Sequence, residues 1–508
     1  MPQGVPVLFF CIFAAISSEA VYYMGNYNKE AFPLTLIVLL LLLAAHFLPD
    51  ISIAGHKLRK VDMLSDLRVK PAAETDAEIP AIDMEGLDAM LADSLPSDPL
   101  PSAVPAEPVV EERSPEQIIS KHYLIPADTC PPGVTCIEDY SDSLGGMSHF
   151  YAALDMVGEL DRPVRIAVFG DSFIEGDIFT SDLRQLFQKK FGGSGVGYVD
   201  MTSNVAGFRP TVLHKFSGWS SHSAVDTAYH RQSLGPTGHY FVSEGGKAWV
   251  QLEGSSRYSS LCKRGERSYI YYEASSSDMT LSCSLDNAPA DTLRVTRAGR
   301  LSQSSVSGDF STVRWDVCDA DSALFFGVSM ESRQGVLVDN FTLRGSAGHN
   351  IYSVPQKRMK EFASLRPYDL IILEYGLNVA SDKVTDYSYY TVSLVKIVKY
   401  LKACFPDVSI LIIGVGDRCA KDEYGEYVTM TGVRELAAYQ QAAALKSGVC
   451  FWNLYEAMSQ AGGMPAFVNS EPAKANKDYT HINFLGGREI ARMLFDAMMF
   501  GKEMYDAH

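Results

Sequence analysis

Residues 164–172 read VRIAVFGDS, a short and mainly apolar strand that ends in a glycine and then in Asp171 and Ser172. A segment with helical spacing, TSDLRQLFQKKFG, follows at 180–192. Further buried strands, separated from one another by helical segments, are expected at 370–374, 409–416 and 450–455. Because continuous apolar strands that alternate with helices are typical of a parallel sheet covered on both faces, the sequence predicts an α/β fold of this kind.

A different pattern interrupts this alternation between residues 208 and 332. Short runs in which apolar and polar residues alternate, such as KAWVQLEG at 247–254 and RSYIYYEA at 267–274, recur there with Gly, Ser and Asp turns between them. That pattern is typical of an antiparallel β-sandwich. We therefore expect residues 208–332 to form a sandwich that is inserted into an α/β domain whose two parts are 115–207 and 333–508.

The N-terminal region contains a long apolar stretch, AFPLTLIVLLLLLAAHFLP, at 31–49. At ~1.5 Å per residue, a helix of this length crosses a hydrocarbon core of ~30 Å, and its run of leucines leaves no polar face. A shorter apolar segment at 5–18 is either a second span or a packed amphipathic segment. Residues 1–55 are therefore predicted to be a membrane anchor with one or two transmembrane helices.

An acidic, proline-rich segment follows the predicted anchor, and we expect residues 56–114 to be a disordered linker. Between Pro71 and Ser114 the chain has seven prolines, eleven carboxylates and one cation. Such a composition cannot bury enough apolar surface to offset the entropy of the chain. The linker supplies much of the formal net charge of −17, which arises from 44 Lys and Arg against 61 Asp and Glu. This excess of carboxylates repels phosphate backbones, so nucleic acid is not an expected partner.

Two features indicate opposite orientations in the membrane. Four cations follow the apolar stretch closely, at Lys57, Arg59, Lys60 and Arg68. Under the positive-inside rule they favour a cytoplasmic location for the residues that follow. In contrast, Cys130 and Cys136 close a short turn-rich loop, CPPGVTC, which indicates a disulfide and an oxidising compartment.

Three short motifs place chemically useful side chains at the carboxyl ends of predicted strands or before the last helix. Ser172 follows the first strand, and Asn378 follows the strand at 370–374 within the sequence GLN. Asp478 and His481, three residues apart, precede the last predicted helix. Taken singly, each residue has a simpler explanation as a helix cap or a turn residue. Together they provide the nucleophile, amide donor, orienting acid and general base that acyl transfer through a serine requires.

In this order the motifs resemble those of the SGNH (GDSL-type) hydrolases, which are serine esterases built on a flavodoxin-like parallel sheet flanked by helices. The resemblance implies that Ser172, Asp478 and His481 form a catalytic triad. It implies no metal and no organic cofactor.

The same resemblance implies an oxyanion hole with three donors. These are the backbone N–H of Ser172, the backbone N–H of Gly345 and the side-chain amide of Asn378. Gly345 fits the spacing of the second family motif best, and Gly348 is the alternative.

A sandwich inserted between the first and second motifs is similar to the Gram-negative peptidoglycan O-acetylesterase branch of this family, although that branch commonly has His where this chain has Phe173. The resemblance implies an enzyme of the cell membrane that removes O-acetyl groups from an envelope glycan such as peptidoglycan, with its catalytic domain facing the periplasm. Three alternatives remain: an O-acetyltransferase with the same triad, a non-catalytic glycan-binding protein and a lipase-like enzyme. The aromatic residues of the insertion form either a sugar-stacking platform or sandwich core: Trp249, Tyr258, Tyr269, Tyr271, Tyr272 and Trp315.

Overall fold

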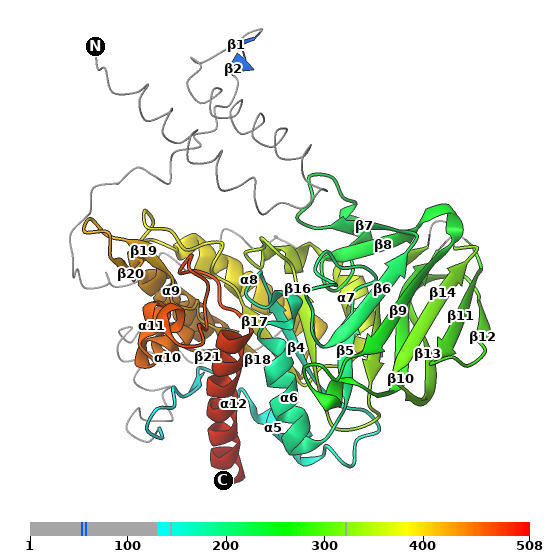
Figure 1. Ribbon diagram of the computed structural model, residues 1–508, viewed down its shortest axis with the longest axis horizontal. Helices are drawn as coiled ribbons and strands as arrows, with labels where there is room; N and C mark the ends of the chain where they lie inside the picture. Colours follow the sequence, from blue (N-terminus) through cyan, green and yellow to red (C-terminus); the bar gives the residue numbers. More distant parts are fainter. Residues whose placement is uncertain are drawn as a thin grey trace, which may run out of the picture. The chain divides into compact units, whose positions relative to one another are not determined.

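Together with two short strands near the N-terminus, the computed structural model describes residues 130–142, 145–275, 277–320 and 323–507 (Figure 1). The two short strands, β1 (Ser52–Ile53) and β2 (His56–Lys57), pair antiparallel within a unit of the chain that comprises residues 1–75. All other described elements belong to a second unit.

A six-stranded sheet lies at the centre of the second unit (Figure 1). In spatial order its strands are β16 (Val336–Thr342), β4 (Val164–Gly170), β17 (Leu370–Glu374), β18 (Ser409–Ile413), β21 (Cys450–Trp452) and β3 (Glu138–Asp139). The first five strands run parallel, and every residue of β4, β17 and β18 is buried. Numbered along the chain, these five strands lie in the order 2-1-3-4-5. The strand order therefore reverses between β4 and β17, and ligands of open α/β sheets bind at the carboxyl ends of strands beside such a reversal.

Helices cover both faces of the central sheet (Figure 1). On one face lie α5 (Ser148–Asp155), α6 (Thr180–Phe191) and α12 (Phe484–Asp506). On the other face lie α7 (Gln356–Leu365), α8 (Ser388–Cys404) and α9 (Thr431–Ser447). The short helices α10 (Leu454–Gln460) and α11 (Gly463–Asn469) precede α12 in the chain. Helix α12 begins where it does because the side chain of Asn483 accepts hydrogen bonds from the first free N–H groups, those of Leu485 and Gly486.

Two antiparallel sheets surround a second hydrophobic core. One sheet contains β13 (Ala298–Phe310), β10 (Gly265–Ala274), β15 (Leu324–Glu331), β8 (His239–Ser243), β7 (Trp219–Ser223) and, paired with β15, β5 (Gly195–Val199). The other contains β12 (Asp291–Val295), β11 (Met279–Leu285), β14 (Thr312–Cys318), β9 (Ala248–Gly254) and β6 (Val212–Ser217). Short 3-10 helices and a hairpin complete the described elements: η3 (Glu175–Asp177), η4 (Arg231–Ser233), η5 (Glu244–Gly246), η6 (Ser260–Cys262), η7 (His349–Ser353), β19 (Cys419–Lys421) and β20 (Tyr427–Thr429).

Half of the six aromatic residues noted in the insertion are buried in the protein interior. Tyr271, Tyr272 and Trp315 are only 1%, 5% and 1% exposed, which excludes them from any surface that contacts a glycan. The Trp249 ring is covered by the Arg314 guanidinium, whose central carbon lies 4.1 Å from the ring centroid. These four residues therefore contribute to packing, whereas Tyr258 and Tyr269 are half-buried.

The sandwich is joined to the central sheet by a backbone hydrogen bond and by a buried ionic cluster. The backbone N–H of Tyr198, on β5, donates to the Asp339 carboxylate of β16 at 2.8 Å. The fully buried guanidinium of Arg366 contacts Asp339 at 2.7 Å and Glu331, at the end of β15, at 3.1 Å. Burial opposes ionisation, but Arg366 prevails and holds the pKa of Asp339 below its ordinary value. The two cores therefore depend on each other.

The predicted fold class, a flavodoxin-like parallel sheet with an inserted sandwich and an N-terminal transmembrane anchor, is wrong as a description of the chain. The fold is mixed, because most of the described strands pair antiparallel and β3 pairs antiparallel with β21 even in the central sheet. With two residues, β3 forms no apolar run from which a strand could be predicted. Within the described ranges no helix is long and apolar enough to cross a membrane. The segments expected to span, 5–18 and 31–49, and most of the predicted linker lie outside the described residues.

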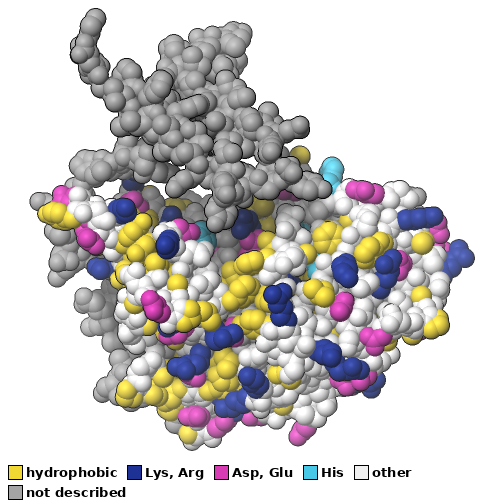
Figure 2. Space-filling model, viewed as in Figure 1, with side chains coloured by type: hydrophobic (Ala, Val, Ile, Leu, Met, Phe, Trp, Pro, Cys, Tyr) yellow, Lys and Arg dark blue, Asp and Glu magenta, His cyan; other side chains and the backbone are white. Residues whose placement is uncertain are grey.

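Charged side chains of both signs are mixed on the described part of the face drawn in Figure 2. Lys and Arg side chains alternate there with Asp and Glu side chains over both the helices and the sandwich strands. No single sign of charge dominates the described part of this face.

Candidate active site

The candidate site lies at the carboxyl ends of β4 and β17, where the strand order reverses. These two strands pair in register, with Gly170 opposite Glu374. The chain leaves β4 through Asp171 and Ser172 and leaves β17 through residues 375–378, so the predicted nucleophile and the predicted amide donor reach the same edge of the sheet. This placement follows from the parallel pairing and not from any contact between the two motifs in the sequence.

Ser172 lies in a tight turn that directly follows β4. The side chain of Asp171 accepts a hydrogen bond from the Phe173 N–H at 2.9 Å, and the Ser172 carbonyl accepts one from the Glu175 N–H at 3.3 Å. A side chain at Gly170 would meet the Glu374 carbonyl at 2.9 Å, so only glycine lets the turn lie this close to β17. The turn leaves Ser172 half-buried at the wall of a cavity.

The predicted acid and base form a pair on a short hairpin before α12. In this hairpin Ala475 and Ile482 form an antiparallel bridge. Nδ1 of His481 lies 2.9 Å from Oδ2 of Asp478, and Oδ1 of Asp478 accepts the His481 backbone N–H at 3.0 Å. The Asp478 carboxylate therefore fixes both the position of the histidine backbone and the orientation of its ring. Burial opposes ionisation, but the hydrogen bonds from His481 and Thr480 prevail and lower the pKa of Asp478.

The β19–β20 hairpin packs against this acid–base loop. Tyr479, between the acid and the base, has a φ of 54°, a conformation that side-chain-bearing residues rarely adopt. Its ring is stacked on that of Tyr427 with centroids 3.5 Å apart, and its carbonyl accepts the Cys419 N–H at 3.0 Å. These contacts hold the strained residue in place and so fix the separation of Asp478 and His481.

Ser172 and His481 line one cavity of about 710 Å³. This volume lies within the ~300–1,000 Å³ that is usual for small-molecule sites. Its apolar wall includes Phe173, Phe208 and Phe484, and the last two rings lie 5.2 Å apart between centroids. The base and the nucleophile of the predicted triad therefore share one space, and Asp478 lies behind the base.

Two backbone N–H groups predicted to bind the oxyanion are not engaged by other groups of the described chain. Neither the Ser172 N–H nor the Gly345 N–H has a hydrogen-bond acceptor among the described residues. Gly345 is exposed and has a φ of 77°. The alternative, Gly348, is buried, and its N–H already donates to Oγ of Ser346 at 2.9 Å. Of the two candidate glycines, Gly345 therefore has the unengaged N–H, and its role as the second donor stays a prediction.

The side-chain amide of Asn378 is already engaged. Its nitrogen donates to Oδ2 of Asp171 at 2.9 Å and to the Ser346 carbonyl at 3.1 Å, which uses both of its hydrogens. The two contacts point the amide toward the nucleophile turn. An oxyanion can accept from Asn378 only if it shares or displaces one of them.

Beneath the turn, Asp171 and Glu374 form a pair of buried carboxyl groups. Asp171 is 0% exposed and Glu374 is 1% exposed, and neither oxygen of Glu374 has a hydrogen-bond partner among the described residues. Burial raises the pKa of Asp171 to about 6, although hydrogen bonds from Phe173 and Asn378 lower it. Burial, reinforced by the charge of Asp171, raises the pKa of Glu374 well above its ordinary value. Burial therefore favours the neutral form of both carboxyl groups, and a charge on one of them opposes ionisation of the other.

Sequence reasoning missed several residues that complete the site. The sequence alone assigns no role to Asp171 or to Glu374. A carboxylate in an otherwise apolar strand run, ILE at 372–374, is the one signal that could have identified Glu374. Arg344 and Glu175, which form an ion pair at 2.6 Å on the cavity wall, gave no signal because 169 positions separate them in the chain.

The described residues contain no cluster of three or more His, Cys, Asp or Glu side chains that could hold a metal ion. The hydroxyl, imidazole, carboxylate and N–H groups at this edge of the sheet are the complete set that acyl transfer through a serine uses.

Comparisons with known proteins extend this description. No family model and no curated protein matches the sequence. A solved structure titled "Peptidoglycan O-acetylesterase in action, 5 min" matches with a TM-score of 0.57 and 22% identity, over 72% of this chain and 99% of that one. Family two carbohydrate esterases from Cellvibrio japonicus and Clostridium thermocellum match with TM-scores of 0.25 and 0.24 and identities of 10% and 12%, over 57% of this chain and 99% and 100% of theirs. The first of these matches confirms, at the level of the fold, the predicted resemblance of this chain to the peptidoglycan O-acetylesterase branch.

Proposed function

We propose that the chain is a serine ester hydrolase that removes O-acetyl groups from an envelope glycan such as peptidoglycan. The observation that carries the proposal is the convergence of Ser172 and the Asp478–His481 pair on one cavity at the point where the strand order reverses. The likeness in fold to a peptidoglycan O-acetylesterase supports the choice of substrate class.

In the first step, Oγ of Ser172 attacks the acetyl carbonyl carbon and His481 accepts the serine proton. Asp478 accepts the Nδ1–H of His481 and so leaves the other ring nitrogen unprotonated toward the serine. The resulting oxyanion accepts hydrogen bonds from the N–H groups of Ser172 and Gly345. When it collapses, the bond to the sugar oxygen breaks, His481 returns its proton to that oxygen, and Ser172 keeps the acetyl group.

In the second step, water takes the place of the sugar hydroxyl. His481 accepts one proton from the water, the hydroxide attacks the acetyl-serine, and acetate leaves as the proton returns to Ser172. A sugar hydroxyl that entered instead of water would produce acetyl transfer. The nature of the acceptor is therefore decided by what the cavity admits, and the products distinguish the two reactions.

We also propose that the folded unit works in an oxidising compartment outside the cytoplasm. The predicted disulfide between Cys130 and Cys136 is present, and it closes a loop of short sequence separation at the start of the described fold. Small exposed loops of this kind keep their disulfides where thiols are not continuously reduced. The described part of the chain also has six free cysteines, of which five are buried.

The test measures acetate released from O-acetylated peptidoglycan and from the same glycan after alkaline removal of its esters. We expect release from the first only, and loss of that release in Ser172→Ala. A matched control, Ser364→Ala, removes a hydroxyl from α7 and should release acetate as the wild type does. Acetate release that is undiminished in Ser172→Ala would contradict the proposal, and acetyl groups that appear on added acceptor sugars would identify a transferase.

A further inference from the structure

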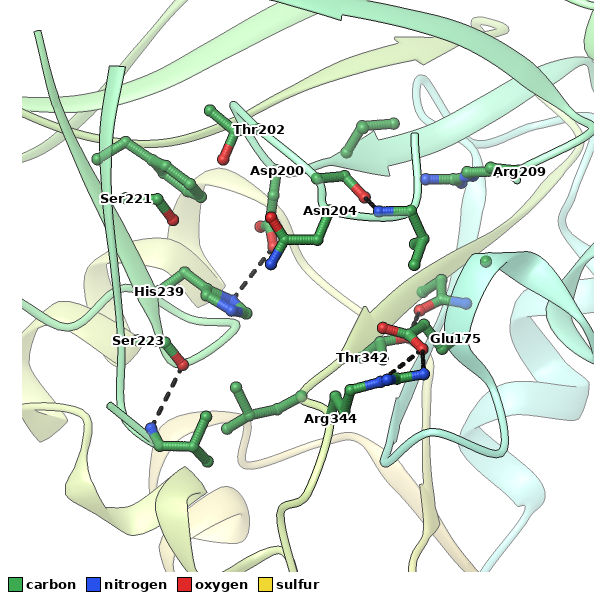
Figure 3. A pocket seen from close by; sticks show the side chains of 18 of the residues that line it. Glu175, Asp200, Thr202, Asn204, Arg209, Ser221, Ser223, His239, Thr342 and Arg344 are labelled. Atoms are coloured by element: carbon green, nitrogen blue, oxygen red, sulfur yellow. Dashed lines mark hydrogen bonds and ion pairs between the residues drawn. The ribbon is translucent and has the colours of Figure 1, made fainter. Parts of the chain in front are cut away.

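A second cavity adjoins the one that contains Ser172 (Figure 3). It has a volume of about 670 Å³ and lies between β5, β7 and β8 of the sandwich and the end of β16. The two cavities share four wall residues: Glu175, Asn204, Val205 and Arg344. A ligand that occupies the second cavity can therefore continue past the Glu175–Arg344 ion pair to the nucleophile.

The charged groups of the second cavity are compensated within the protein. His239 contacts Asp200 at 3.2 Å, and Arg344 contacts Glu175 at 2.6 Å (Figure 3). A third carboxylate, Asp177, is fully buried and is paired with Arg209 at 2.8 Å. Asp177 also pairs with Arg184 at 3.2 Å, and Asp226 adds a fourth carboxylate to the cavity wall. Because these carboxylates balance the cations, the cavity has no excess of positive charge for an anion such as a phosphate. The pairing favours an uncharged ligand.

Several polar groups in the cavity remain available to such a ligand. The side chains of Thr202, Asn204 and Ser221 point into it (Figure 3), and none of them has a hydrogen-bond or ionic partner among the described residues. These groups supply both donors and acceptors, as a ligand rich in hydroxyl groups requires.

Apolar side chains lie among these polar groups. Val225 is 45% exposed, and together with Leu343 and Phe241 it lines the cavity. Apolar surface beside hydrogen-bonding groups matches a pyranose ring, which has C–H faces and a hydroxyl-bearing edge. A neutral sugar therefore fits both the charge balance and the mixed character of the walls.

We propose that this cavity is a subsite for an uncharged sugar residue of the same glycan chain whose ester is presented to Ser172. This inference rests on the proposed function, because it assumes that the substrate is a glycan. It assigns the sandwich a defined role: β7, β8 and the loop after β5 hold the neighbouring sugar, and that contact positions the ester over the nucleophile. Binding energy from a remote part of a substrate is used in this way to orient the reacting group.

The direct test uses binding and does not depend on catalysis. Ser221 faces the cavity, whereas Ser220, its neighbour on β7, faces the other side and contacts Glu244 at 3.2 Å. Ser221→Trp fills the cavity, and Ser220→Trp adds the same bulk to the opposite face as a matched control. Isothermal titration of the full chain with an N-acetylglucosamine tetramer should show millimolar or tighter binding for the wild type and the control, and at least a tenfold loss in Ser221→Trp.

A second variant tests the subsite without the risk that a tryptophan disturbs the fold. Thr202→Ala combined with Ser221→Ala removes two uncommitted hydroxyl groups without adding bulk, and it should weaken binding in the same direction. Equal binding by all four proteins, or no binding by the wild type at millimolar concentration, would overturn the inference.

A kinetic measurement separates this inference from the proposed function. In Ser221→Trp the ratio of kcat/KM for acetylated glycan to kcat/KM for a small aryl acetate should fall at least tenfold, mainly through KM for the glycan. A ratio that is unchanged in a protein with a wild-type thermal transition would overturn the subsite. If the wild type bound the tetramer but released no acetate from any glycan, the proposed function would fail and the subsite would stand.

Discussion

Two substitutions of Asp478, to Asn and to Ala, both remove its charged hydrogen bond to His481, but we expect them to lower the activity by different amounts. Asp478 receives the imidazole Nδ1–H through Oδ2 and two backbone N–H groups through Oδ1, those of Thr480 and His481. Asp478→Asn can keep the two backbone contacts through its amide oxygen, because that oxygen replaces Oδ1. Its NH₂ group then faces the imidazole and donates to Nδ1. The proton of the ring must move to the other nitrogen, which faces Ser172 and can no longer accept the serine proton.

The expected magnitudes follow from the exposure of this pair. The side chains of Asp478 and His481 are 49% and 47% exposed, so solvent screens their interaction. A hydrogen bond to a charged group contributes ~1.5–3 kcal/mol, and its loss in Asp478→Ala should lower kcat/KM by roughly 10–100-fold. In Asp478→Asn the opposing neutral hydrogen bond adds ~0.5–1.5 kcal/mol, so this variant should be slower than Asp478→Ala by about twofold to tenfold.

The assay is the steady-state hydrolysis of a small aryl acetate by the wild type and both variants, at a pH where all three keep the wild-type thermal transition. A rate for Asp478→Asn that is equal to or greater than that of Asp478→Ala would refute the tautomer argument. The contact would then contribute only by holding the loop, a task that asparagine performs as well as aspartate.

Three further variants test the surroundings of the site. Asn378→Ala should lower kcat for the aryl acetate by about 10²–10³-fold, the usual effect of removing one oxyanion donor, and a loss below threefold would mean that its amide stays with Asp171 and Ser346 during turnover. Glu374→Gln should gain stability over the wild type as the pH rises. Because burial raises the pKa of Glu374, the stability that the wild type gains from the protonated carboxyl is complete below the ordinary value of 4.5 and is lost at higher pH, by at most about 1.4 kcal/mol per pH unit. Urea unfolding of both proteins at pH 5 and pH 7 measures this loss, and parallel pH profiles of stability would contradict it. Glu331→Gln should destabilise the unit by about 3 kcal/mol or more, because Arg366 loses one of its two buried partners; an unchanged urea midpoint would show that the ionic cluster is dispensable.

The strands that build the active site could be predicted because their information is local. β4, β17 and β18 are mainly apolar runs followed by glycine-containing turns, and their burial on both faces explains why they carry no alternation. The chemistry at their ends could be predicted for the same reason. Ser172 and Asn378 each follow a strand directly, and the three-residue spacing of Asp478 and His481 suits one loop.

What could not be predicted depends on contacts between distant parts of the chain. β5 has the sequence GVGYV, and its pairing with β15 follows from the shape of the junction, which two glycines with positive φ allow. The buried cluster around Arg366 brings together side chains from β15, β16 and the loop after α7, and no local pattern marks them. The sandwich takes strand β5 from the first part of the α/β domain and shares the ionic cluster with it. It therefore cannot be removed as an independent module.

The hydrogen bonds of Asn378 and the second cavity also depend on contacts between distant parts of the chain, so neither could be predicted. The predicted donor Asn378 is held by Asp171 and by the Ser346 carbonyl, and only the folded chain brings these groups together. The walls of the second cavity come from five separate segments, whose polar residues are ordinary loop and strand-edge residues in the sequence. Their common purpose becomes visible only in three dimensions.

The most direct test of the proposed chemistry is to find where the acetyl group resides during turnover. The wild-type protein is mixed with a small aryl acetate, quenched in acid within the first turnover and digested, and the peptides are analysed by mass spectrometry. One acetyl group on the side chain of Ser172, absent from Ser172→Ala and from protein mixed with the free phenol, is the predicted result. Acetyl found on another residue, or an aryl acetate turnover by Ser172→Ala that matches the wild type while no acetyl-serine forms, would contradict it.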